Sequence, residues 1–401
     1  MEEPDVASRC TADDGPRWEP CFSSAAFESD AASQVRQRQR GEQQRGAAAA
    51  WYVSRSPAVR MRDTSPGETE PKRAASGTGL LVVARGMVWV VDPESGAARG
   101  SELDSRAACL AVDPFDPGRV WCGSDAGVLR SDDAGLTWRR SGLEGENVTA
   151  LAASPARPDL LWAGTEPSAV WRSENGGTSW ARADGLLDLP SASGWSFPPR
   201  PESHHVRWIG CHPAEGGRLW IAIEAGALVA TPDGGRTWLD RVPGGPYDTH
   251  QLAIHPARPE WLRSAAGDGY FESRDGGASW SSPEEGLEVG YLVSVALDPG
   301  DPDIVVVSAA SSPFSAYRAG HADGRIYRRE GRGRWERILR GWPDPPASIA
   351  PRLVPGTAPG ELWAADERGV HGSRDGGRSW ELAGAFDSAI ESVAALDIVE
   401  S

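Results

Sequence analysis

The sequence SRDGGRSW at residues 373–380 recurs four more times along the chain with small changes. The other copies are SDDAGLTW (131–138), SENGGTSW (173–180), TPDGGRTW (231–238) and SRDGGASW (273–280). The third side chain of each copy can accept N–H bonds across a turn, and the fifth residue is a glycine that tolerates a left-handed backbone. One carboxylate per copy is too few oxygen ligands for calcium. We therefore predict that each copy is a structural hairpin rather than an active site.

The residues predicted to hold these hairpins are the third and eighth positions of the five copies, namely Asp133, Trp138, Asn175, Trp180, Asp233, Trp238, Asp275, Trp280, Asp375 and Trp380. A degraded copy, RREGRGRW at 328–335, divides the long gap before the last tryptophan. The resulting units of about 40 to 60 residues are typical of four-stranded propeller blades.

Six units with their own four strands are predicted at 106–140, 147–183, 204–241, 249–282, 290–338 and 347–383. Two further segments are incomplete. Residues 391–398 form a first strand without followers, and residues 80–96 supply later strands without a first. Pairing these two segments makes a seventh blade, closes the ring and removes exposed sheet edges. The predicted fold is all-β, a seven-bladed propeller over residues 76–401.

Residues 1–75 differ in composition from the remainder. The segment is polar and biased, with QVRQRQRGEQQRG at 34–46, and it has few apolar residues to bury. We predict a disordered, low-complexity tail. A regulatory role for this tail and a natural translation start at Met61 are the alternatives.

Composition excludes several classes of function. The net charge of −16 argues against a protein that follows phosphate backbones. The five cysteines include no CxxC pair, so neither a zinc knuckle nor a full disulfide framework is predicted. No apolar run reaches the length of a membrane span. We expect a cytoplasmic protein with no nucleic-acid or membrane partner.

The pattern S/T-x-D-x-G-x-S/T-W resembles the Asp-box or BNR repeat, and the resemblance covers residues 79–401. The whole chain is similar to the bacterial WD40/YVTN/BNR-like repeat proteins, most closely at 189–210, 247–256 and 265–277. The superfamily includes sialidases, xyloglucanases, sortilin-type receptors and photosystem II assembly factors. The sialidase FRIP-type motif is absent ahead of the first copy, and the xyloglucanases have two propellers where this chain predicts one. The resemblance therefore implies the fold and neither of these two activities.

Propellers commonly bind ligands where the loops before the first strands meet the loops between second and third strands. Two long insertions, at 184–203 and 310–324, join those loops on the same face. The residues predicted to bind a ligand there are Trp195, His204, His205, Arg207, Asp248, His250, Tyr291 and His321.

Three functions remain open at this stage. The first is a soluble propeller that binds a small polar ligand or carbohydrate at the central mouth. The second is a glycoside hydrolase using Glu166, Glu224 and Asp268, or a hydrolase or lyase assisted by a divalent metal ion on His205, His250 and His321. The last is a scaffold that docks a partner protein. No cofactor other than that metal is expected.

Overall fold

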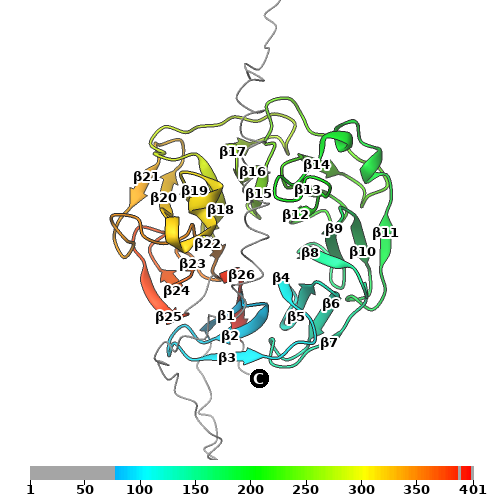
Figure 1. The fold of residues 1–401 in the computed structure, drawn as a ribbon, viewed down its shortest axis with the longest axis horizontal. Coiled ribbons are helices and arrows are strands. Elements are labelled where there is room, and N and C mark those ends of the chain that lie inside the picture. Colours follow the sequence, from blue (N-terminus) through cyan, green and yellow to red (C-terminus); the bar gives the residue numbers. More distant parts are fainter. Residues whose placement is uncertain (1–76, 387–389, 399–401) are drawn as a thin grey trace, which may run out of the picture. The chain divides into compact units, whose positions relative to one another are not determined.

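Seven antiparallel sheets arranged in a ring form a seven-bladed β-propeller in the computed structural model, which describes residues 77–386 and 390–398 (Figure 1). The prediction of an all-β, seven-bladed ring is confirmed. The predicted tail at 1–75 lies outside the described residues. In the part of the chain that is described, no helix has the length and apolar character needed to cross a membrane.

Each blade begins with an inner strand. These strands are β26 (Ile390–Ile398), β4 (Ala107–Asp113), β8 (Asn147–Ala153), β12 (Val206–Cys211), β15 (Thr249–His255), β18 (Tyr291–Asp298) and β22 (Arg352–Pro355). The second strands are β1 (Gly77–Ala84), β5 (Asp116–Ser124), β9 (Leu161–Glu166), β13 (Leu219–Ile223), β16 (Arg258–Ala266), β19 (Asp301–Ala310) and β23 (Leu362–Asp366).

The third strands are β2 (Met87–Val91), β6 (Gly127–Ser131), β10 (Val170–Ser173), β14 (Ala227–Thr231), β17 (Gly269–Ser273), β20 (Arg325–Glu330) and β24 (Gly369–Ser373). The fourth strands are β3 (Ala98–Ser101), β7 (Arg139–Arg140), β11 (Ala181–Ala183), β21 (Glu336–Ile338) and β25 (Glu381–Ala385). The short helices are η1 (Leu186–Asp188), η2 (Pro190–Gly194), α2 (Pro313–Tyr317) and η3 (Ala319–His321).

Two blades lack the predicted fourth strand. Beside β14 and β17, the outer edge is reduced to single bridges, Ala230 with Leu239 and Glu272 with Ser281. A proline follows within four residues of each bridge, at Pro243 and Pro283. Because proline lacks an N–H, it cannot extend the hydrogen-bonded ladder.

The ring closes between the two ends of the propeller. β26 pairs antiparallel with β1, from Gly77 opposite Ile398 to Ala84 opposite Ile390. The sheet order β26-β1-β2-β3 combines the C-terminal strand with three N-terminal strands, as predicted (Figure 1). The second strand carries Leu80, Leu81 and Val82, which are all fully buried. Closure therefore seals a hydrophobic strand that would otherwise be a sheet edge.

The five copies of the repeated motif lie on the hairpins after the third strands β6, β10, β14, β17 and β24. In the last copy, the Asp375 carboxylate accepts the Ser379 N–H (2.9 Å) and the Ser379 hydroxyl (2.6 Å). The Ser373 hydroxyl donates to the same carboxylate at 2.9 Å and accepts the Gly377 N–H at 2.9 Å. Gly377 has φ of 84°, the left-handed conformation that this turn requires.

These hairpins also connect neighbouring blades. The carbonyl of the fourth residue of the motif accepts a side-chain N–H from the preceding blade in three copies. The pairs are Trp121 with Gly176 (3.1 Å), Trp220 with Gly276 (3.0 Å) and Arg328 with Gly376 (2.8 Å). The hydrophobic core likewise lies between adjacent sheets, because one cluster joins Tyr270 of one blade with Val295 and Trp335 of the next.

Candidate functional site

The inner strands share an irregularity at one position. Six of them shift register against their second strands, which is the mark of a β-bulge. The residues at the shifts are Ala108, Thr149, Arg207, His250, Val293 and Glu391. Arg352 begins β22 and lines the same cavity as these six. A bulge changes the direction of a side chain. The six bulged strands and the start of β22 thus place one residue from each of the seven blades around the channel. We call these seven residues the mouth ring.

The mouth ring separates two spaces. Above it lies an open hollow of about 430 Å³, a size suited to a small ligand. Below it the channel narrows to a cavity of about 100 Å³. Arg207, Arg352 and Glu391 line both spaces. A ligand bound in the hollow therefore faces this layer of charged side chains.

Glu224, after β13, is the central carboxylate of the hollow. Its Oε2 lies 2.8 Å from His205 Nε2 and 3.4 Å from Arg207 Nε. Burial alone would raise the pKa of this carboxyl, but the Arg207 charge and the His205 hydrogen bond lower the pKa to about 2. Glu224 is therefore an anion at neutral pH.

His250 is fully buried at the side-chain level and oriented by the backbone. Its Nδ1 lies 2.6 Å from the Leu292 carbonyl, so Nδ1 carries a proton and donates it. Nε2 faces the Tyr291 hydroxyl at 3.3 Å and Asp248 Oδ2 at 3.5 Å. Burial opposes the charged imidazole, but the Tyr317 phenol and Asp248 outweigh it and raise the pKa of His250. His250 is thus a candidate proton donor.

The 184–203 insertion contributes a wall of the hollow. Arg200 forms a two-pronged ion pair with Glu166, with Nε–Oε1 and Nη2–Oε2 distances of 3.0 and 2.7 Å. The Arg200 guanidinium also stacks on Phe197, whose ring packs edge-on against His205 at 4.9 Å. Glu166 therefore faces the hollow as a neutralised carboxylate, held by a charge-assisted pair.

Four predicted site residues do not line the hollow around Glu224. Trp195 is 6% exposed and belongs to a hydrophobic cluster, and His204 packs on it edge-on. Asp268 accepts the N–H groups of Tyr247 (3.0 Å) and Asp248 (3.1 Å), so it caps a loop. His321 is exposed and stacks on Phe314 at 4.7 Å between ring centroids.

The sequence prediction did not include Arg352, Glu391 and Tyr317 in the site. A signal for the mouth ring nevertheless exists in the sequence. In five blades the ring residue lies six positions before the proline that ends the strand, at 108, 149, 207, 250 and 293, with prolines at 114, 155, 213, 256 and 299. β22 and β26 lack that proline at the matching position, so this signal misses the two charged residues on them.

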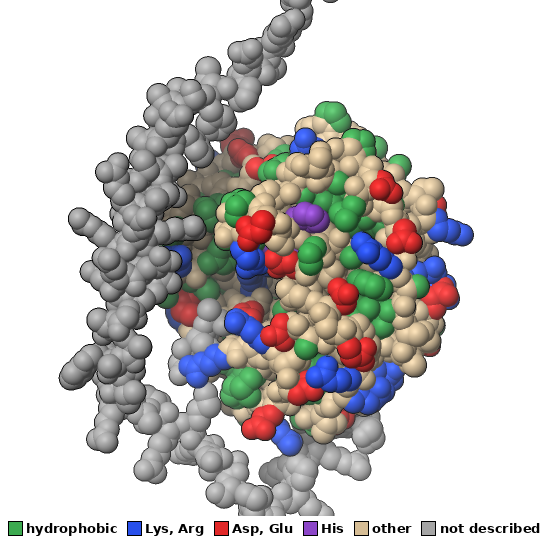
Figure 2. All heavy atoms as spheres, turned by 45° about the vertical axis from the view of Figure 1, so that its right-hand side comes forward, with side chains coloured by type: hydrophobic (Ala, Val, Ile, Leu, Met, Phe, Trp, Pro, Cys, Tyr) green, Lys and Arg blue, Asp and Glu red, His purple; other side chains and the backbone are tan. Residues whose placement is uncertain are grey.

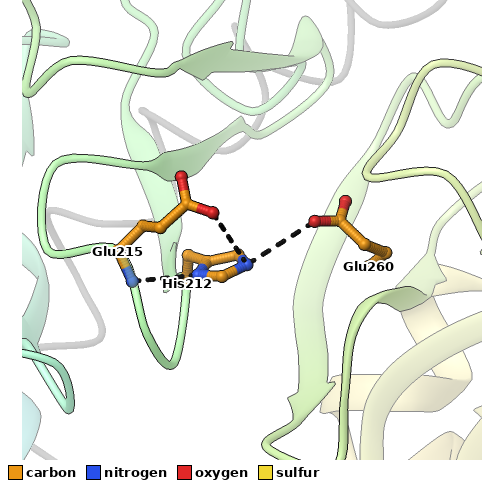
Figure 3. Close-up of side chains that lie close together, drawn as sticks. All are labelled: His212, Glu215 and Glu260. Carbon is orange, nitrogen blue, oxygen red and sulfur yellow. Dashed lines mark hydrogen bonds and ion pairs between the residues drawn. The ribbon is translucent and has the colours of Figure 1, made fainter.

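Two groups of side chains within the described residues have donor atoms close enough for a metal ion. The first is His212, Glu215 and Glu260 (Figure 3). His212 Nδ1 accepts the N–H of Ala214 (3.2 Å) and that of Glu215 (3.0 Å), so the proton of the neutral ring is on Nε2. A protonated Nε2 lacks the lone pair that a metal needs. This group is therefore a neutral histidine whose Nε2–H faces two carboxylates rather than a metal site.

The second group is Glu224, Asp248 and His250, with donor atoms within 4.8 Å of one another. Here the Nδ1–H bond to a carbonyl leaves the Nε2 lone pair available in the neutral ring, as in many metal-binding histidines. The Arg207 cation beside Glu224 opposes a second positive charge. The three predicted metal ligands His205, His250 and His321 do not form either of these two groups.

No family model matches the chain. The oligoxyloglucan-reducing end-specific xyloglucanase of Emericella nidulans is 24% identical over 169 residues, which is 38% of this chain and 20% of that protein. The xyloglucanase of Hypocrea jecorina is 24% identical over 258 residues, 51% of this chain and 30% of that protein. This chain thus matches only about a fifth to a third of the length of these relatives.

Solved structures resemble the fold. The GH74 xyloglucanase from Xanthomonas campestris has a TM-score of 0.55 and 17% identity, and the match covers 79% of this chain and 56% of that one. YCF48 bound to D1 peptide has a TM-score of 0.50 and 18% identity, with 70% and 83% of the two chains covered. At such low identity these likenesses concern the fold alone.

Proposed function

We propose that this propeller binds a small polar ligand of carbohydrate size at the hollow above the mouth ring. The observation that supports it is the hollow itself, about 430 Å³ in volume, where Glu224 and Arg207 meet an aromatic wall formed by Phe197. Fixed donors and acceptors beside aromatic rings suit a hydroxylated ligand, because each hydroxyl both donates and accepts.

Binding is tested with the full chain and a panel of mono- and oligosaccharides, including xyloglucan oligosaccharides, by ligand-detected NMR. A variant with both Glu224→Gln and His250→Ala is expected to lose binding at least tenfold. Glu174→Gln is the matched control, because Glu174 is an exposed carboxylate paired with Arg172 on a hairpin. Unchanged affinity in the double variant contradicts the proposal.

Glycoside hydrolysis is a second candidate. It is favoured by the xyloglucanase relatives and by the short separation of Glu224 and Asp248, whose nearest donor oxygens lie within 4.8 Å. Retaining glycosidases place two carboxyl groups roughly 5 Å apart. In this proposal, the ionised Glu224 attacks the anomeric carbon while Asp248 protonates the departing glycosidic oxygen; Asp248 then takes a proton from the water that releases the sugar from Glu224.

Hydrolysis is tested by release of reducing ends from xyloglucan and of nitrophenol from aryl glycosides. Activity that disappears in Glu224→Gln and remains in Glu174→Gln supports this second candidate. If the chain binds saccharides but releases no product in these assays, only the binding function remains supported.

A further inference from the structure

The charges around the hollow are paired, with one exception. Glu166 pairs with Arg200 and Glu224 with Arg207. At the rim, Glu391 pairs with Arg106 at 3.0 Å. Among residues 77–386 and 390–398, no carboxylate forms an ion pair with Arg352, whose polar contact is the Tyr317 hydroxyl. Three carboxylates and three arginines line the hollow, and Arg352 is the arginine among them that has no ion-paired carboxylate within the described residues.

Arg352 lies in an environment that is unfavourable to its charge. Burial lowers the pKa of Arg352, and the nearby Arg207 guanidinium lowers it further. Arg207 itself has a buried Nε that lacks a hydrogen-bond partner of good geometry. Buried cations without a full set of acceptors cost free energy unless a partner arrives. An acidic ligand group would supply that partner.

Tyr317 lies beside the same charges, because Arg352 and Arg207 are among the groups that act on its phenol. Its ring lies 5.4 Å from the Arg352 guanidinium carbon. Burial would raise the pKa of this phenol, yet His250, Arg352 and Arg207 together lower it. The field at the floor of the hollow is thus positive enough to favour a negatively charged oxygen.

We propose that the ligand bound at the mouth carries a carboxylate, which the guanidinium groups of Arg352 and Arg207 receive. This inference rests on the proposed binding function and narrows it to small acidic polyols such as sugar acids. Guanidinium matches a carboxylate with two parallel hydrogen bonds. The remaining hydroxyls of such a ligand face Glu224 and His205, which accept and donate hydrogen bonds.

The charge of the ligand follows from the pairing. One unmatched arginine is neutralised by one negative charge, which a carboxylate supplies. A phosphate monoester carries about −1.5 to −2 at neutral pH and adds repulsion from the three paired carboxylates. On the face seen in Figure 2, acidic and basic side chains are interspersed, so that face presents no large basic patch that would compete with the hollow for an anion. Carboxylates are therefore favoured over phosphates.

The test is calorimetric titration of the full chain at pH 7 with D-glucuronate, D-glucose and D-glucose 6-phosphate. We expect glucuronate to bind at least tenfold more tightly than either of the others. Arg352→Gln should remove that preference, whereas Arg352→Lys should retain part of it. Arg139→Gln is the control, because Arg139 is an exposed arginine on β7 paired with Asp132.

The outcomes separate the two proposals. Equal binding of glucuronate and glucose, or a preference that survives Arg352→Gln in a folded variant, overturns the carboxylate inference and leaves the binding function standing. Tightest binding of glucose 6-phosphate overturns the carboxylate in favour of phosphate. Absence of heat from all three ligands at millimolar concentration overturns the carboxylate inference, whereas the binding function is decided by the saccharide panel.

Discussion

Replacement of Glu224 by glutamine removes the central anion of the hollow and keeps its size. The surroundings lower the pKa of Glu224 from 4.5 to about 2. Each pKa unit corresponds to about 1.4 kcal/mol, so the charged form contributes about 3 kcal/mol to stability at pH 7. The side chain is 13% exposed, so solvent screens this interaction only in part. Glu224→Gln is therefore expected to lower the free energy of unfolding by about 2–3 kcal/mol.

The effect has a defined pH dependence. Because the folded pKa is lowered, the contribution is complete above the unfolded value of 4.5 and is lost as the pH falls toward 2. At pH 3 about 1 kcal/mol should remain. The assay is urea unfolding followed by tryptophan fluorescence, for the wild type and the variant at pH 7 and pH 3. Glu174→Gln, which alters a surface ion pair, should lower the free energy of unfolding by less than about 0.5 kcal/mol at both pH values. A Glu224→Gln loss that is the same at pH 7 and pH 3, or below 1 kcal/mol at pH 7, would falsify the assigned charge environment.

Two further predictions concern the scaffold. Glu272 is buried between Arg263 and Arg329, so Glu272→Gln leaves two buried cations unpaired and should cost about 3–5 kcal/mol in urea unfolding. A loss below 1 kcal/mol would mean that water reaches these arginines. Asp375→Ala removes the acceptor of three hydrogen bonds in a hairpin and should cost about 1–2 kcal/mol in thermal unfolding, whereas an unchanged Tm contradicts the structural role of that carboxylate.

The blades could be predicted from the sequence because their determinants are local. A hairpin needs only a short acceptor at the third position and glycine at the fifth, as in Ser373 to Trp380, and its hydrogen bonds span four residues. The missing strand beside β17 has an equally local cause, because Pro283 stands where β11 and β21 of other blades still continue.

The candidate site could be predicted only in part. Loop position indicated Glu224, Asp248 and His250, since Glu224 follows the second strand β13 of one blade and the other two lie at the start of the inner strand β15 of the next. The same argument also selected Trp195, which the structure places in a hydrophobic cluster. Burial of a side chain in an insertion depends on what the insertion packs against, and no pattern within 184–203 encodes that.

The sequence by itself determined the repeat, the number of blades and the pairing of the chain ends, because each follows from turn chemistry and from the need to bury sheet edges. Only the tertiary structure decided which side chains meet. The mouth ring takes one residue from each of seven strands, from Ala108 to Glu391, and their distances are set by closure of the whole ring. In the sequence alone, nothing distinguishes the charge of Arg352 from that of the other arginines. It becomes informative once the blades bring Arg200, Arg207 and Arg106 to their own carboxylates and leave Arg352 without one.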